Sequence, residues 1–272
     1  MTTRAFRAVV LLLAVAGALL PTAASGARTV TLPPVNATFD YQIGGSYPPA
    51  HGVRIVDRDR LSTPAKGIYS ICYVNAFQTQ AEEDSWWRKK HPTLLLHDSA
   101  GHLVEDPGWP GEYLLNTRTA TSRSALLRII GAWFDSCAHK GFRAVEPDNL
   151  DSWTRSKGLL TRAENLAFAR SLVARGHADG LAVAQKNAAE LGSTGRSKAR
   201  FDFAIAEECQ VYAECSAYTS VYGRHVIEIE YSDNPLTYYT AACRARGARI
   251  SITLRDRDVM PRGSTDYVDR HC

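Results

Sequence analysis

Short runs of apolar residues alternate along the chain with longer segments in which apolar residues recur at helical spacing. The short runs have the length of β-strands, and polar or turn-forming residues follow each of them. We expect strands at 39–43, 53–56, 68–74, 142–145, 181–184, 201–206, 226–229 and 250–254. Strands that alternate with helices indicate a parallel sheet covered by helices, and eight of them favour an α/β fold of the (β/α)8, TIM-like barrel type.

Three of the helical segments have clear boundaries. Apolar residues lie on one face of 122–138, which predicts an amphipathic helix there. The next helix begins at Thr161, because Thr161 and Glu164 form a capping-box sequence, and it runs towards His177. A third helix is expected at about 236–246, where the following glycine ends it.

Residues 86–121 do not fit this alternation, and we expect them to form a hairpin and loop inserted after the third strand. Such an insertion would form one wall of a cleft. The chain contains no repeat and no Pro/Gly-rich linker. We therefore expect one domain over residues 28–272.

The first residues indicate export. Arg4 and Arg7 precede an apolar stretch at 8–20, and small residues follow it at 21–27. This order is typical of a secretory signal peptide, predicted here at 1–27 and cleaved from the mature chain. The apolar run is shorter than the roughly 20 residues that span a bilayer. We expect a secreted protein without a membrane partner.

The charge of the chain is nearly balanced. Its formal net charge is +4, and removal of Arg4 and Arg7 would leave about +2, which gives no electrostatic footprint for nucleic acid. The basic clusters at 88–90 and 244–246 are interpreted as solvated faces. We expect a monomer with no nucleic-acid partner.

An even number of cysteines in an exported chain favours disulfides. Spacing leaves the connectivity open, although Cys209 and Cys215 could close a short loop and Cys243 and Cys272 could tie the last residues to a helix. Cys72 would then pair with Cys137. The chain has neither a CxxC nor an HExxH motif, so we expect no metal and no cofactor.

Carboxylates follow several of the predicted strands. In a barrel of this kind the carboxyl ends of the strands meet at one mouth, where catalytic groups lie. Acids at these ends include Glu146, Asp148 and Asp151 after the fourth strand, Glu207 and Glu208 after the sixth, and Glu230 after the seventh. Asp148 is the best single candidate for catalysis.

Acids gathered at one mouth suit glycosidic cleavage. Like charges raise one another's pKa, so that one carboxyl stays protonated as a proton donor while another stays ionised. Glycoside hydrolysis needs one protonated and one ionised carboxyl of this kind. Aromatic and amide side chains near the acids suit sugar faces and hydroxyls, although an aromatic at a strand end more often belongs to the core or rim. They are Tyr41, Gln42, Tyr73, Asn75, Trp109 and Tyr231.

Other chemistries find less support in the sequence. It lacks GxSxG, GxxxxGK[ST] and GxGxxG, and all six thiols can pair. Two alternatives remain for Glu146, Asp148 and Asp151. They could bind calcium through oxygen ligands, or they could cap the following loop and bond to Asn149 or Arg155.

The sequence also resembles a known family over nearly its whole mature length. The motifs are found at 39–45, 67–80, 141–152, 180–187, 201–209 and 227–231. In this order they are similar to those of glycoside hydrolase family 114, the endo-α-1,4-polygalactosaminidases. The resemblance implies a TIM-like barrel and a catalytic acidic pair on the fourth and sixth strands. Carried over by motif, the pair is Asp148 with Glu207, and Glu208 is a close competitor because the phase of the strand is open.

These observations predict a secreted, endo-acting glycoside hydrolase that cleaves α-1,4-linked galactosamine polymers. Asp148 would be the nucleophile or base and Glu207 the acid. The predicted substrate-binding residues are Gln42, Tyr73, Asn75, Glu146, Asp151, Glu208, Glu230 and Tyr231. Among these, Glu146, Asp151 and Glu230 would pair with substrate ammonium groups. The alternative is a catalytically silent carbohydrate-binding protein on the same barrel.

Overall fold

The computed structural model describes residues 1–2 and 29–272. The signal peptide predicted at 1–27 lies, apart from its first two residues, outside the described part of the chain.

Eight parallel strands form one sheet in which neighbours in space are also neighbours in sequence. All eight strands predicted from the sequence are present, with ends that differ by a few residues. They are β1 Phe39–Gln42, β2 Ile55–Asp59, β3 Tyr69–Asn75, β4 Ala144–Asp148, β5 Ala182–Lys186, β6 Phe203–Glu207, β7 Val226–Tyr231 and β8 Ser251–Arg255. A short β9, Asp269–His271, was not predicted and pairs antiparallel with β8.

The sheet curls until its first and eighth strands approach each other. The backbone N–H of Ala37, just before β1, donates to Oγ of Ser251 in β8 at 3.0 Å. Side chains from β1 and β7 also belong to one buried apolar cluster. The result is a nearly closed, mostly parallel barrel, which confirms the predicted TIM-like fold.

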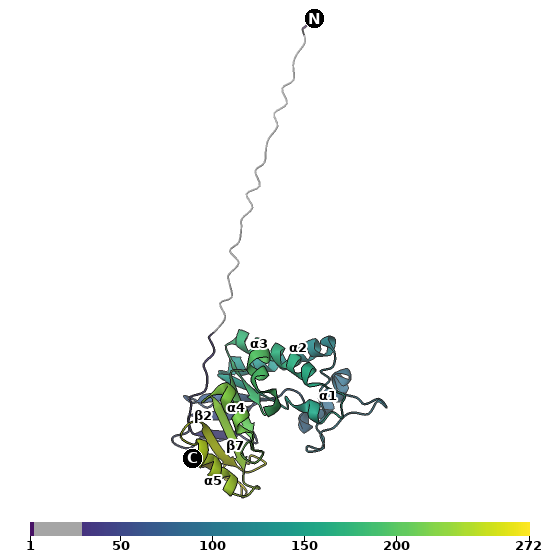
Figure 1. The fold of residues 1–272 in the computed structure, drawn as a ribbon. Helices are drawn as coiled ribbons and strands as arrows, with labels where there is room; N and C mark the ends of the chain where they lie inside the picture. The colour runs from purple at the N-terminus through teal and green to yellow at the C-terminus, as the bar shows by residue number, and fades with distance from the viewer. Residues whose placement is uncertain (3–28) are drawn as a thin grey trace.

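Four helices cover the outside of the barrel, and α2 and α3 pack side by side (Figure 1). The helices are α2 Ala120–Lys140, α3 Arg162–Asp179, α4 Cys215–Tyr222 and α5 Thr237–Arg246. The predicted capping box is present, since Thr161 accepts a hydrogen bond from the N–H of Glu164 and the Glu164 carboxylate accepts one from the N–H of Thr161. None of the described helices combines the length and apolar character needed to cross a membrane.

The alternation of strands and helices is less regular than the sequence pattern suggests. Loops replace helices between β1 and β2 and between β2 and β3. Residues 60–68 are too few for a helical crossover, which takes about a dozen residues or more. Short helical turns occur in other connections. η3 Ser152–Thr154 follows β4, and η4 Ala189–Leu191 and η5 Gly195–Ala199 link β5 to β6 in place of a longer helix.

The predicted insertion follows β3 and contains more helix than expected. It includes η1 Ala81–Glu83, α1 Asp84–Lys90 and η2 Pro92–Leu94. Antiparallel bridges then join Leu95 to Leu115 and Glu105 to Tyr113, so the predicted hairpin is present beyond these helical turns. The insertion, which includes α1, projects from the barrel (Figure 1).

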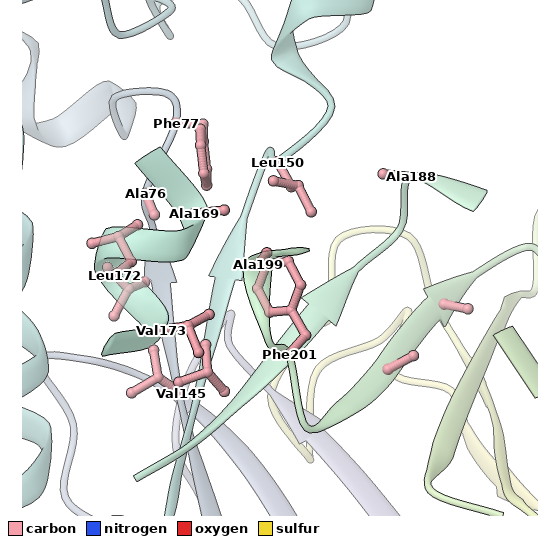
Figure 2. Packing of buried hydrophobic residues seen from close by; sticks show 14 of the residues in the cluster. Ala76, Phe77, Val145, Leu150, Ala169, Leu172, Val173, Ala188, Ala199 and Phe201 are labelled. Carbon is pink, nitrogen blue, oxygen red and sulfur yellow. The ribbon is translucent and has the colours of Figure 1, made fainter. Parts of the chain in front are cut away.

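Apolar side chains form two layers, one inside the barrel and one between strands and helices. Alternate residues of each strand point inwards and outwards. In the outer layer, Leu172 and Val173 of α3 face Val145 of β4 (Figure 2). Gly176 allows α3 to lie close to β5 as well, because a Cβ there would lie 2.6 Å from Cγ2 of Val183.

Three disulfides tie these elements together, in one of the pairings that the sequence left open. Cys72 of β3 bonds to Cys137 of α2. Cys209 bonds to Cys215 at the start of α4. Cys243 of α5 bonds to Cys272 and so holds the segment that contains β9.

The acids of β7 face the helices, whereas Glu230 was expected at the mouth. Ile227, Ile229 and Tyr231 fill the inside of the barrel, so the intervening Glu228 and Glu230 point outwards. Two nitrogens of Arg246 in α5 donate to Glu228 at 2.7 and 2.8 Å. Glu230 is buried, and its Oε1 accepts from the N–H of Gln210 at 3.0 Å.

Burial raises the pKa of Glu230 to about 7, and the nearby charge of Glu228 adds to the effect. A carboxyl whose pKa is higher in the folded state than in the unfolded state stabilises the fold below its unfolded pKa. That contribution is lost as the pH rises through the folded value. Glu230 therefore destabilises the protein at alkaline pH.

We expect Glu230→Gln to stabilise the protein by about 2 kcal/mol at pH 8 and to have little effect at pH 4. The amide keeps an acceptor for Gln210 and removes the buried charge. Urea unfolding at the two pH values measures this difference. An equal effect at both pH values would contradict the account.

Candidate active site

A cavity of about 590 Å³ opens at the carboxyl ends of the strands, between the barrel and the insertion. This is the end of a barrel where catalytic groups usually lie. Strand ends contribute Tyr73, Asp148, Asn187, Glu207 and Tyr231 to its lining. The insertion contributes Asp106, Trp109 and Glu112, and the segment after β8 contributes Arg257 and Asp258.

The ammonium group of Lys186 lies just beneath this cavity, at the end of β5. The side chain is 1% exposed. Its Nζ lies 2.5 Å from Glu146, 3.4 Å from Asp148 and 3.5 Å from Glu207, each distance measured to a carboxylate oxygen. Burial alone would lower the pKa of Lys186, but these carboxylates raise it well above its usual value. One charged ammonium therefore holds carboxylates from β4 and β6 together.

Asp148 is held as a carboxylate at the end of β4. The Tyr73 hydroxyl donates to Oδ2 at 2.8 Å, and the N–H of Asn149 donates to Oδ1 at 2.7 Å. Burial favours the neutral form, but the charge of Lys186 and these two donors outweigh it, so the pKa of Asp148 lies below its usual value. Asp148 is ionised at neutral pH.

Glu207, on the other side of Lys186, has the opposite tendency. The Tyr231 hydroxyl donates to its Oε1, and Nδ2 of Asn187 donates to its Oε2 at 2.9 Å. Burial raises the pKa of Glu207 above its usual value, and the charge of Asp148 raises it further, although Lys186 opposes both effects. The two carboxyls around one ammonium thus differ in their affinity for a proton.

A second pair of carboxyls lies deeper in the barrel. Glu146 is fully buried and accepts hydrogen bonds from Lys186 and from the Tyr41 hydroxyl, the latter at 3.2 Å. Burial and the neighbouring Glu146 raise the pKa of Asp57 on β2 well above its usual value. Glu146 therefore supports Lys186 from below and does not line the cavity.

The structure separates Glu207 from Glu208. Glu207 is the last residue of β6 and faces the cavity, whereas Glu208 has a positive φ of 56° and turns away. The carboxylate of Glu208 accepts from Arg257 at 2.7 and 2.9 Å and from Nδ2 of Asn234 at 2.6 Å. Glu208 itself does not line the cavity, although its partner Arg257 does.

The other predicted binding residues divide between the cavity and its surroundings. Tyr73, Asp151 and Tyr231 line the cavity. Asn75 lies behind the lining, where its Oδ1 accepts from Nδ2 of Asn149 at 2.9 Å. Its Nδ2 donates to Oε2 of Glu112 at 3.3 Å.

Gln42 and Glu230 were expected at the sugar site and lie elsewhere. The Gln42 amide donates to Asp40 at 2.8 Å and accepts from Nε of Arg58 at 2.9 Å, so its polar atoms are used within the protein. Glu230 points towards the helical layer, as described above. Pairing between Glu230 and a substrate ammonium is therefore excluded by its orientation.

Sequence reasoning did not single out Lys186, Asn187 or Glu112. The segment 180–187 was recognised as one of the family motifs, but the sequence did not show which of its side chains point into the barrel. A signal was present: Lys186 follows an otherwise apolar run in β5, broken only by Gln185. Glu112 lay in an insertion whose geometry no periodicity describes.

The described residues offer little for a metal ion. The group with suitable spacing is Cys209, Cys215 and Glu228, but both cysteines are in a disulfide. At Glu146 and Asp148 the Lys186 ammonium takes the place that calcium would need. Asp151 bonds to NH1 of Arg155 at 2.9 Å, as the loop-capping alternative predicts.

Two solved structures have a similar fold. Ega3 of Aspergillus fumigatus, solved in complex with galactosamine, matches with a TM-score of 0.71 and 22% identity over 91% of this chain and 100% of that chain. The glycoside hydrolase domain of PelA from Pseudomonas aeruginosa matches with a TM-score of 0.59 and 14% identity over 86% of this chain and 97% of that chain. At these identities the likeness concerns the fold.

Sequence comparison adds a relative and a family. An uncharacterized protein of Deinococcus radiodurans is 29% identical over 204 residues, which are 68% of this chain and 63% of that protein. The chain thus spans less than two thirds of the length of this relative. The model of glycoside-hydrolase family GH114 matches residues 20–272. Together with the barrel and its acidic mouth, this match shows that the chain belongs to glycoside-hydrolase family GH114.

Proposed function

We propose that the protein is a secreted, endo-acting glycoside hydrolase that cleaves α-1,4-linked galactosamine polymers. The observation that carries this proposal is the pair Asp148 and Glu207, which share one buried ammonium and have pKa values shifted in opposite directions. A glycosidase needs one ionised and one protonated carboxyl at the scissile bond.

In this mechanism Glu207 is the general acid. Its raised pKa keeps a proton available for the glycosidic oxygen as the bond breaks. Asp148 is ionised and either attacks the anomeric carbon or activates water. Tyr73 and Tyr231 hold the two carboxyls in place through their hydroxyls. Lys186 stays charged and limits the repulsion between the two acids.

The polymer is inferred from the family and from the cavity. The endo mode and the α-1,4 linkage follow from the resemblance to polygalactosaminidases, and the similar fold of Ega3 was solved with galactosamine bound. Trp109 is 51% exposed and lines the cavity, where its ring suits the face of a sugar. Asp151 also lines the cavity.

Several further features belong to this proposal. Three disulfides support an extracellular location, since such bonds persist in oxidising compartments. We propose residues 28–272 as the single catalytic domain. The proposed chemistry needs only side chains of this chain, with no cofactor, and a monomer suffices for it because every named residue belongs to one chain.

Asp148→Asn and Glu207→Gln should each lower kcat/KM on α-1,4-galactosamine polymer by at least about 100-fold, the usual loss for a catalytic acid or base. Release of reducing ends measures the rate, and mass spectrometry of the products reports internal cleavage. Glu208→Gln is the matched control, because it removes the neighbouring charge outside the cavity. We expect it to stay within about tenfold of wild type.

If Asp148→Asn and Glu207→Gln both cleave as well as the wild type, the assignment of the pair is wrong. If the wild type binds the polymer and never cleaves it, the protein is a carbohydrate-binding protein instead.

Lys186→Met should move the pH profile of kcat/KM upwards. Activity rises as Asp148 loses its proton and falls as Glu207 loses its own. Lys186 lowers both pKa values, so its loss raises both, and each limb should move by about one pH unit or more. Lys66→Met, at an exposed lysine outside the cavity lining, is the control and should leave the profile in place. A shift towards lower pH would contradict this role of Lys186.

A further inference from the structure

The carboxylates that line the cavity differ in how their charge is balanced. Asp106 and Asp151 pair with Arg155 at 2.6 and 2.9 Å. Asp148 and Glu207 share Lys186, as described above. Glu82 and Asp258 are exposed to solvent. Glu112 remains: it lines the cavity, is half-buried, and has no cationic partner among residues 29–272.

Glu112 is nevertheless held firmly on one side. Nε2 of Gln78 donates to its Oε2 at 2.8 Å, and Nδ2 of Asn75 donates to the same oxygen at 3.3 Å. Both amides are buried, with 0% of Gln78 and 4% of Asn75 exposed. Within the described residues Oε1 has no hydrogen-bond partner, so it is available to a ligand in the cavity.

The electrostatic surroundings of Glu112 favour a cation. Burial raises its pKa, and the charges of Asp148 and Asp106 add to that effect, against the hydrogen bonds from Gln78 and Asn75. A positive group placed next to the carboxylate would relieve this repulsion.

Glu112 also lies close to the reacting groups. Asn75 bonds to Glu112 through its amide nitrogen and to Nδ2 of Asn149 through its oxygen. Asn149 in turn donates its N–H to Asp148. A chain of three hydrogen bonds therefore links Glu112 to the proposed catalytic carboxylate, and both carboxyls line the same cavity.

An aromatic ring accompanies the carboxylate. The N–H of Glu112 donates to the carbonyl of Trp109 at 3.1 Å, so a tight turn of the insertion presents both residues to the cavity. The face of an exposed indole attracts both sugar C–H groups and nearby cations.

We propose that Glu112 binds the ammonium group of a galactosamine unit whose ring packs on Trp109, and that this contact selects unacetylated over N-acetylated polymer. An acetamido group has no positive charge and would leave the carboxylate uncompensated. The inference rests on the proposed function. Glu146 and Glu230, which were expected to bind ammonium groups, lie away from the cavity. Glu112 of the insertion takes this role instead.

The test compares kcat/KM on unacetylated and on N-acetylated α-1,4-galactosamine polymer. In Glu112→Gln the ratio of the two values should fall by about tenfold or more, the usual effect of a lost charge-assisted hydrogen bond. The amide keeps an acceptor for Gln78. Because the readout is a ratio, a general loss of folded enzyme cancels, and the melting temperature checks the fold separately.

Glu190→Gln is the matched control, since it removes one exposed carboxylate outside the cavity lining. It should leave the ratio unchanged. A wild type that cleaves the polymers while Glu112→Gln keeps the wild-type ratio would overturn the role of Glu112 and leave the proposed function standing. A wild type that prefers the N-acetylated polymer would also overturn it. A wild type that cleaves neither polymer would overturn the function and the inference together.

Discussion

The buried ammonium of Lys186 is the interaction on which the site depends. Removing a lysine charge from water costs several kcal/mol, and only close carboxylates can offset that cost. Glu146, Asp148 and Glu207 do so at distances from 2.5 to 3.5 Å. The benefit is mutual, because acids this close would otherwise raise one another's pKa. Lys186 thus permits Asp148 to stay ionised next to Glu207.

This arrangement requires that the barrel fixes which residues of each strand point inwards. Lys186 ends β5, between β4 with Asp148 and β6 with Glu207, and neighbouring strands lie about 4.8 Å apart. The inward residues before Lys186 on β5 are the small Ala182 and Ala184, which leave room for a long side chain. A shift of one residue in any of these strands would send its charged group to the helical layer.

The strength of the sequence pattern decided what could be predicted. All eight barrel strands and the capping box at Thr161 were evident, because periodicity and local spacing encode them. Spacing left the disulfide connectivity open, since Cys72 and Cys137 are 65 residues apart. The direction of a side chain at a strand end was not evident. Successive side chains of a strand point alternately inwards and outwards, but the sequence does not show which of them point inwards. For this reason Glu230 was misplaced, Glu207 and Glu208 could not be separated, and Lys186 was overlooked. The positive φ of Glu208 interrupts the alternation of inward and outward side chains, and no sequence signal predicts it.

The barrel strands and the insertion after β3 contribute different groups to the cavity, and this separation has a consequence for evolution. The barrel strands carry the groups proposed for bond cleavage, and changes there disturb a tightly coupled set of charges. Trp109 and Glu112 stand on a surface turn instead, where substitutions and changes of length are usually tolerated. Relatives could therefore diverge in the sugars that they accept by altering this one segment while the reaction itself is inherited intact.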